Sequence, residues 1–277
     1  MSLNERYNRN NIFQHVAGHL PKNRRNFTFA VLDNMPLQGT FGKLDARPCE
    51  GKVIVVNDDA FIVLSPDKKD IRVVDRRLAT CVPEIGDTVR VLPYRRCDFE
   101  GFCVSDSKPE ICTMDDGSTY TVNRMVLGGN GRDVKLPVPK AECHELKSLI
   151  ELMETAPLPD GFRMLMHMLV DSKARDFSIV DPKPKDIIKT PPAVLFTVET
   201  SKHCGQVRVF YNRGLDSFGI ELLQDGLQTY FNDSVFFDEL THRLYELIDD
   251  GTWNRIDVEV IAAAKKPRKA KALPLAA

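Results

Sequence analysis

The sequence of 277 residues has no apolar run long enough to cross a membrane. A spanning helix needs about 20 mostly apolar residues, and no window approaches that length. The first residues, MSLNERYNRNNIFQHVAGHL, also carry charged and amide side chains where a secretion signal needs an uninterrupted apolar stretch. We therefore expect a cytoplasmic protein with no membrane partner.

The cysteines and histidines form no recognisable metal site. Seven cysteines are scattered without a CxxC pair, and the spacings of Cys97, Cys103 and Cys112 differ from those of a zinc ribbon or knuckle. His15 and His19 are four residues apart, but no HExxH glutamate or third ligand accompanies them. We expect reduced thiols, no metal and no cofactor.

Specific catalytic motifs are also missing. His203 and Cys204 are adjacent, so on a strand they would point to opposite faces. The glycines between Gly128 and Gly131 lack the Lys-Ser/Thr that follows in a P-loop. The sequence therefore favours a non-enzymatic protein. A hydrolase or transferase with a site between domains is the alternative, and its candidate residues are His203, Arg208, Tyr211 and Arg213.

Positive and negative charges are almost balanced, with 38 Lys and Arg against 39 Asp and Glu, yet both ends of the chain are basic. Residues 1–26 form a basic arm, and residues 263–277 form a basic tail with too little apolar content to fold. Such a tail can neutralise phosphates of a nucleic acid, or it can simply solubilise the protein. Its cations are Lys265, Lys266, Arg268, Lys269 and Lys271.

Short apolar runs separated by turn residues predict strands throughout residues 27–140. Five of them lie between Gly51 and Asp106, and the connections are too short for crossover helices. We expect an antiparallel meander curled into a small β-barrel, which removes exposed edges. Asp116-Gly117 predicts a hairpin that extends the same sheet. The five runs are Val53–Val56, Phe61–Leu64, Ile71–Val74, Val89–Leu92 and Gly101–Val104.

The pattern changes after residue 140. Residues 141–177 show helical spacing and are expected to form a helical connector, and residues 178–192 hold four prolines, as a linker does. Residues 193–262 combine four strands, a helix over Val235–Asp249 and a final strand at Ile256–Val260. The predicted fold class is α+β, with an N-terminal small antiparallel β-barrel, a helical connector and a C-terminal antiparallel sheet carrying one packed helix.

Arginines and aromatics in the barrel region predict a nucleic-acid surface. Small barrels bind single strands by combining a cationic groove with aromatic side chains on which bases stack. Nearby acids, Asp67, Asp70, Asp75 and Glu84, would instead give a solvated face of mixed charge. The candidate residues for binding DNA or RNA are Arg72, Arg76, Arg77, Arg90, Tyr94, Arg95, Arg96 and Phe99.

The order of features in Gly51–Asp106 resembles the KfrB-type domain of plasmid and conjugative-element proteins. The matching features are Gly51-Lys52-Val53-Ile54, Phe61-Ile62-Val63, Ile71–Asp75, Leu78, Gly86-Asp87, Val89-Arg90-Val91, Tyr94 and Gly101. Cys97–Glu100 departs from the glycine-rich turn of that pattern.

That resemblance implies an accessory protein of a mobile element, such as a plasmid or phage, without catalytic residues. We therefore expect a protein that binds nucleic acid, or a host or transfer-machinery protein, or both. A second class of function is an inhibitor or adaptor that binds only protein in a host or transfer complex, and whose acidic middle mimics or blocks a nucleic-acid surface.

Overall fold

The computed structural model describes residues 3–8, 10–21, 26–39, 42–104, 106, 108–124 and 134–264. The chain forms two compact units. Unit 1 combines the residues up to Met35, Ala46–Tyr94 and those from Asn254 onward, and unit 2 combines Pro36–Asp45 with Arg95–Trp253. Both units contain sheets and few helices, so the α+β class is confirmed. Among the described residues, no helix is long and apolar enough to span a membrane.

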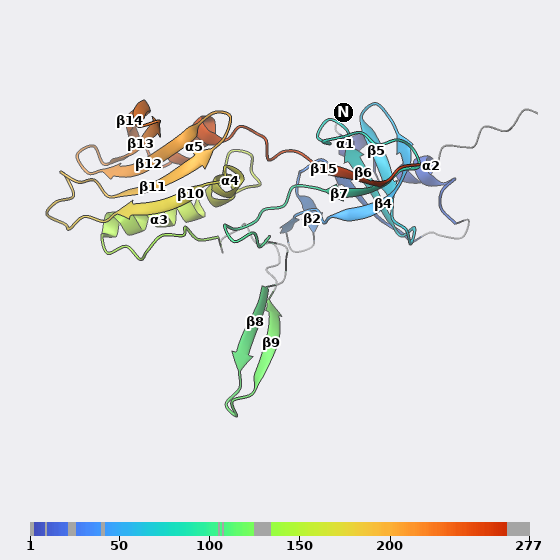
Figure 1. Cartoon of the computed structure of the whole chain (residues 1–277), viewed down its shortest axis with the longest axis horizontal. Helices are drawn as coiled ribbons and strands as arrows, with labels where there is room; N and C mark the ends of the chain where they lie inside the picture. Colours follow the sequence, from blue (N-terminus) through green and yellow to red (C-terminus); the bar gives the residue numbers. More distant parts are fainter. Residues whose placement is uncertain are drawn as a thin grey trace, which may run out of the picture. The chain divides into compact units, whose positions relative to one another are not determined.

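Unit 1 is built on a six-stranded sheet with the strand order β1-β6-β5-β4-β7-β15 (Figure 1). β1 and β6 run parallel, and the other neighbours are antiparallel. The described sheet is open, with β1 and β15 at its edges, so the predicted barrel is not confirmed. The strands are β1 (Thr28–Leu32), β4 (Cys49–Val56), β5 (Ala60–Leu64), β6 (Asp70–Asp75), β7 (Thr88–Leu92) and β15 (Asp257–Ala262).

β15 brings the end of the chain back to unit 1. The strand expected at Ile256–Val260 does form, but it pairs with β7 and not with the sheet that precedes it in the sequence. Val258 lies opposite Val91 in the register, so β15 fills the outer edge of β7. Hydrogen bonds from the Thr80 amide to the Ile256 carbonyl and from the Ile256 amide to the Leu78 carbonyl guide the chain into this edge.

The fifth predicted barrel strand, Gly101–Val104, is not a strand of this sheet. The segment before it makes a tight reversal, in which the Asp98 carboxylate accepts hydrogen bonds from the amides of Glu100 and Phe102. This reversal places Cys97 opposite Cys103, and the two are joined by a disulfide. The expectation of reduced thiols is therefore wrong for this pair, because a six-residue separation across a turn brings the sulfurs together.

Two short helices, α1 (Leu3–Arg6) and α2 (Ile12–Val16), pack on the sheet of unit 1. Ile12 and Val16 are fully buried against apolar side chains of β4, β5 and β6. The described part of the predicted basic arm is therefore folded, because its apolar face completes a core.

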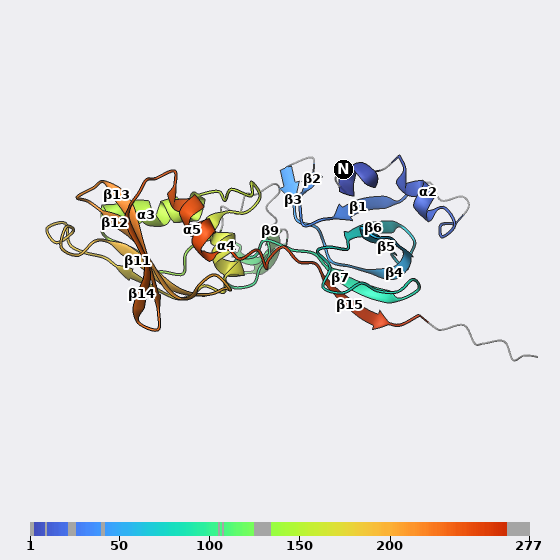
Figure 2. The same ribbon diagram turned by 90° about the horizontal axis from the view of Figure 1, so that it is seen from above.

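Unit 2 contains a five-stranded antiparallel sheet whose strands follow their sequence order. Its strands are β10 (Arg175–Val180), β11 (Ala193–Glu199), β12 (Cys204–Asn212), β13 (Ser217–Gln224) and β14 (Leu227–Val235). The helices α3 (His144–Thr155), α4 (Leu165–Asp171) and α5 (Leu240–Ile248) lie on one side of it (Figure 2). Three helices thus pack on this sheet where the sequence predicted one, since those of the expected connector share its core. The first residues of the expected linker belong to β10, which pairs with β11.

Two further hairpins complete the described strands. β2 (Leu37–Gly39) pairs with β3 (Gly42–Leu44), and β8 (Lys108–Thr113) pairs with β9 (Thr119–Arg124). The second hairpin confirms the turn predicted at Asp116-Gly117, where Gly117 has a φ of 82°. It is a separate two-stranded sheet and does not extend the sheet of unit 1.

A buried arginine fixes the helical layer of unit 2. The Arg163 side chain is fully buried and forms ion pairs with Asp160 (2.8 Å), Asp171 (2.7 Å) and Asp249. Its guanidinium lies 3.9 Å from the centre of the Trp253 ring. A buried cation is tolerated only when it is paired and hydrogen-bonded, so these contacts hold the turn before α4, the end of α4 and the end of α5 together.

Replacing this cation tests that role. Arg163→Met leaves three carboxylates without their partner, and we expect the free energy of unfolding to fall by about 3–5 kcal/mol. Urea unfolding followed by the fluorescence of Trp253, the only tryptophan in the sequence, measures the change. Arg175→Met is the control, because that side chain is half exposed and its surface pairs contribute at most about 1 kcal/mol. A loss below about 1 kcal/mol for Arg163→Met would contradict the assignment.

His167 makes a second buried contact in unit 2. It occupies the third position of α4, and its Nδ1 accepts the backbone amide hydrogen of Met164, the residue before the helix, at 3.0 Å. Burial, assisted by the positive charges of Arg96 and Arg163, lowers the pKa of His167 from 6.5 to about 3. The imidazole is therefore neutral in the folded protein at pH values where the unfolded chain takes up a proton.

This shift makes stability depend on pH. The contribution of His167 is present above pH 6.5 and is lost as the pH falls toward 3, at about 1.4 kcal/mol per pH unit. His167→Gln keeps an acceptor for the Met164 amide and does not titrate. We expect the stability difference between wild type and variant to shift by about 2 kcal/mol, against the wild type, between pH 7 and pH 5 in urea unfolding. A constant difference would show that His167 is not neutral in the fold.

Candidate nucleic-acid interface

The arginines predicted to bind nucleic acid in unit 1 are mostly neutralised by acids. Arg90 lies directly opposite Glu50 on β4 and Glu259 on β15 and pairs with both, at 2.7 and 3.2 Å. The pairs of the others are Arg72 with Asp70 at 3.7 Å and Arg77 with Asp75 at 2.6 Å, while Arg76 donates to the Asn57 carbonyl at 3.1 Å. Each paired carboxylate would repel an approaching phosphate, so this surface resembles the mixed-charge alternative.

The remaining predicted barrel residues are divided between the two units. Tyr94 is half-buried in unit 1. Arg96 is buried in unit 2, where it pairs with Asp45 at 2.8 Å and lies 4.5 Å from the centre of the Phe162 ring. Arg95 pairs with Asp106. Phe99 packs on the core of unit 2, with its ring edge-on to that of Phe177. The predicted tail cations, Lys265, Lys266, Arg268, Lys269 and Lys271, lie outside the described residues.

The four residues named for an enzyme do not gather at one site. His203 precedes β12 and Arg213 follows it, so the nine residues of the strand separate them by roughly 30 Å. Each side chain has its own neighbour: Arg213 pairs with Glu145 at 2.9 Å, and Tyr211 donates to Asp216 at 2.6 Å, which raises the pKa of the phenol. In the part of the chain that the structure describes, no group of three or more His, Cys, Asp or Glu side chains can hold a metal ion.

The face of the unit 2 sheet turned away from the helices carries a different set of side chains. Because side chains alternate along a strand, the register separates two rows across the sheet. One row packs with the helices and consists of Phe196, Val207, Leu222 and Tyr230. The other, which we call the outer row, consists of Leu195, Arg208, Glu221 and Phe231.

Two phenylalanine rings lie side by side on this outer face. The rings of Phe210 and Phe231 are nearly parallel, with 23° between their planes and 6.1 Å between their centres. Phe210 is opposite Gly219 in the register, and a Cβ added to Gly219 would come within 2.1 Å of the Phe210 ring. The glycine therefore lets the ring lie flat on the sheet. Phe231 has 52% of its surface exposed, so its ring is open to solvent.

A cation accompanies these rings. The Arg208 guanidinium lies 4.7 Å from the centre of the Phe210 ring, and it pairs with Glu221 at 3.1 Å. The pair makes the outer face nearly neutral at its centre, and it fixes the guanidinium plane near the ring. We call Arg208, Phe210 and Phe231 the aromatic platform. Phe210 is itself buried, so the ring of this platform that is open to solvent is that of Phe231. A flat exposed ring is suited to stacking against other planar groups, including nucleobases.

Sequence reasoning missed Phe210 and Phe231, which lie in the region of the four strands predicted within residues 193–262. Nothing in the sequence showed which face of those strands the helices would cover. Gly219 was the one indication of the Phe210 ring position in the sequence, because a glycine inside a strand often marks the close approach of another group.

The chain matches no protein-family model, no curated protein and no solved structure. The resemblance of Gly51–Asp106 to KfrB-type domains therefore stays a prediction. What the protein binds has to be inferred from the surfaces of its two units.

Proposed function

We propose that the protein is a non-enzymatic binding protein that takes single-stranded DNA or RNA on the aromatic platform of unit 2. One observation carries this proposal: the Phe231 ring is half exposed in the middle of β14 and lies parallel to Phe210. Bases of a single strand have free faces, whereas those of a duplex are stacked on one another. The exposed Phe231 ring, supported by the buried Phe210 ring beside it, therefore favours single strands.

Stacking supplies the main attraction in this proposal. Each base that stacks on an aromatic side chain contributes about 1–3 kcal/mol, and the contribution depends little on base identity. Arg208 adds a cation close to the platform, although its pairing with Glu221 limits its value for phosphates. Phosphate contacts would come from the basic tail, whose cations were predicted from the sequence.

A role in a plasmid or phage is proposed on the resemblance of Gly51–Asp106 alone. Such a role would place the protein in the cytoplasm, and the unit 1 sheet would then correspond to the KfrB-type domain.

The second candidate function is binding of a host or transfer-machinery protein. The exposed apolar side chains of Leu227, Phe236 and Phe237, at and beyond the two ends of β14, favour it.

Phe231→Ala tests the platform. We expect it to weaken binding of a labelled single-stranded oligonucleotide by about 5- to 100-fold, because one base loses its stacking partner. Fluorescence anisotropy at about 50 and 200 mM salt measures this, and the dependence on salt reports phosphate contacts separately. Phe231→Tyr should retain the affinity, because the ring is kept.

Phe237→Ala is the matched control, since it removes an exposed ring of the same kind beyond the end of β14. A version lacking residues 265–277 should lose salt-dependent affinity but keep its sensitivity to Phe231→Ala. Equal binding by wild type and Phe231→Ala, or no binding by either, would reject the proposal. In the second case, co-purification with a protein partner would support the second candidate function.

A further inference from the structure

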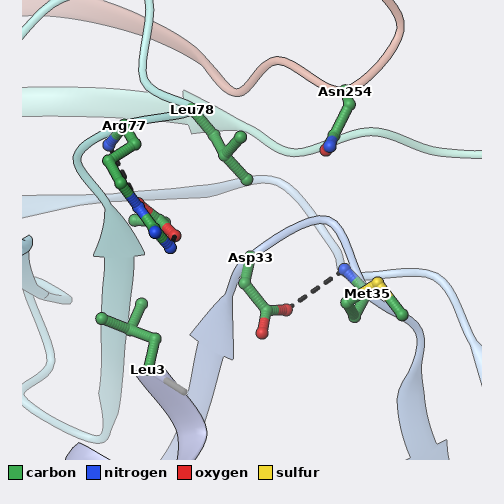
Figure 3. Close-up of a pocket in the computed structure, with 7 residues that line it drawn as sticks. Leu3, Asp33, Met35, Arg77, Leu78 and Asn254 are labelled. Carbon is green, nitrogen blue, oxygen red and sulfur yellow. Dashed lines mark hydrogen bonds and ion pairs between the residues drawn. The ribbon is translucent and has the colours of Figure 1, made fainter. Parts of the chain in front are cut away.

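Unit 1 contains an open pocket of about 450 Å³ at the carboxyl ends of two strands (Figure 3). β1 and β6 are parallel, so their carboxyl ends lie at the same end of the sheet, where Asp33 follows β1 and Asp75 closes β6. The volume lies within the range of small-molecule sites, about 300–1,000 Å³. Its apolar wall is formed by Leu3, Met35 and Leu78.

The polar side chains of the pocket carry one negative charge in excess. Asp75 is buried and accepts two hydrogen bonds from the Arg77 side chain, so this pair is neutral. The Asp33 carboxylate accepts hydrogen bonds from the Met35 amide at 3.1 Å and from the Asn4 side chain at 2.7 Å, but no cation pairs with it among the described residues. Burial raises the pKa of Asp33, with a smaller effect from Asp75, so its charge is incompletely compensated.

Asn254 adds an acceptor without a donor. Its side-chain oxygen is buried and has no hydrogen-bond partner within the described parts of the chain. The side chain reaches toward the pocket from the segment that leads into β15 (Figure 3). A buried acceptor that lacks a donor is unfavourable, and a ligand that donates a hydrogen bond removes that penalty.

We propose that this pocket binds a small organic cation, whose amine or guanidinium group donates hydrogen bonds to Asp33 and Asn254. The aliphatic part of the ligand lies against Leu3, Met35 and Leu78. An anion is disfavoured by Asp33, and a neutral ligand leaves the carboxylate uncompensated. A bare metal ion would leave the apolar wall unused, so the combination of acceptors and apolar surface favours an organic cation. This site is independent of the platform in unit 2.

The first experiment titrates the full chain, labelled with ¹⁵N, with n-butylguanidinium and n-butylammonium and follows amide resonances by NMR. We expect saturable shifts at residues around Asp33 and Asn254. Butanol and butyrate have the same apolar part without the positive charge, and they should give no saturable shifts. The proposal would be overturned if butanol or butyrate bound saturably with the same affinity as the cations. It would also be overturned if neither cation gave saturable shifts.

Variants then identify the atoms involved. Asp33→Asn keeps an acceptor for the Met35 amide and removes the charge, and we expect it to weaken cation binding at least about tenfold. Asp58→Asn is the matched control, because it removes one negative charge from an exposed position between β4 and β5. Equal affinities for wild type and Asp33→Asn, or an equal loss with Asp58→Asn, would also overturn the proposal.

Thermal unfolding shows whether the variants are folded. Because burial disfavours the charge of Asp33, we expect Asp33→Asn to melt no lower than the wild type in the absence of ligand at pH 7. If it does not fold, Asn254→Leu provides the same test by removing the unpaired acceptor. That variant should also lose affinity for the cation, and retention of full affinity would reject the role of Asn254. Neither result depends on whether Phe231 binds nucleic acid.

Discussion

The burial of the Arg163 guanidinium is the constraint on which much of unit 2 depends. Three carboxylates from separate segments have to reach one cation, and Trp253 has to cover it. These contacts fix where α4 begins and where α4 and α5 end. The apolar core that these helices share with the five-stranded sheet places them on one face, and the opposite face is left to Arg208, Phe210 and Phe231 (Figure 2). The arrangement of the helix ends thus depends on neutralising one charge, and the position of the proposed binding surface depends on the core beneath them.

Local patterns in the sequence predicted most of the strands and several pairings between consecutive strands, but not the pairings between strands that are distant in the sequence. Alternating apolar residues and turn signals located β4 to β7, the strands β11 to β14 and the β8–β9 hairpin. The same signals predicted Ile256–Val260 as a strand, yet its partner β7 lies far away in the sequence, and periodicity carries no information about such pairing. The disulfide between Cys97 and Cys103 was not predicted from the sequence, because it depends on the shape of a turn and not on a motif.

The candidate sites also depend on contacts between residues that are distant in the sequence. Arginines were visible in the sequence, but only the register shows that Arg90 faces both Glu50 and Glu259, which removes it from a free basic surface. Phe231 and Asn254 had no motif at all. Each stands out only in the folded structure. The Phe231 ring is exposed to solvent, and the Asn254 side-chain oxygen is a buried acceptor without a donor among the described residues. Such unsatisfied groups arise from tertiary structure and are therefore hidden in the sequence.

The pairing of β15 with β7 has a consequence for synthesis on the ribosome. β7 ends at Leu92, and its outer neighbour begins at Asp257, so the ribosome has to translate residues 93–256 before that edge can be covered. At about 5–20 residues per second, this takes roughly 8 to 33 s. During that time the nascent chain presents an unpaired strand edge, which is a template for pairing with neighbouring chains. The yield of soluble protein in the cell should therefore depend on translation speed and on chaperones that shield β7.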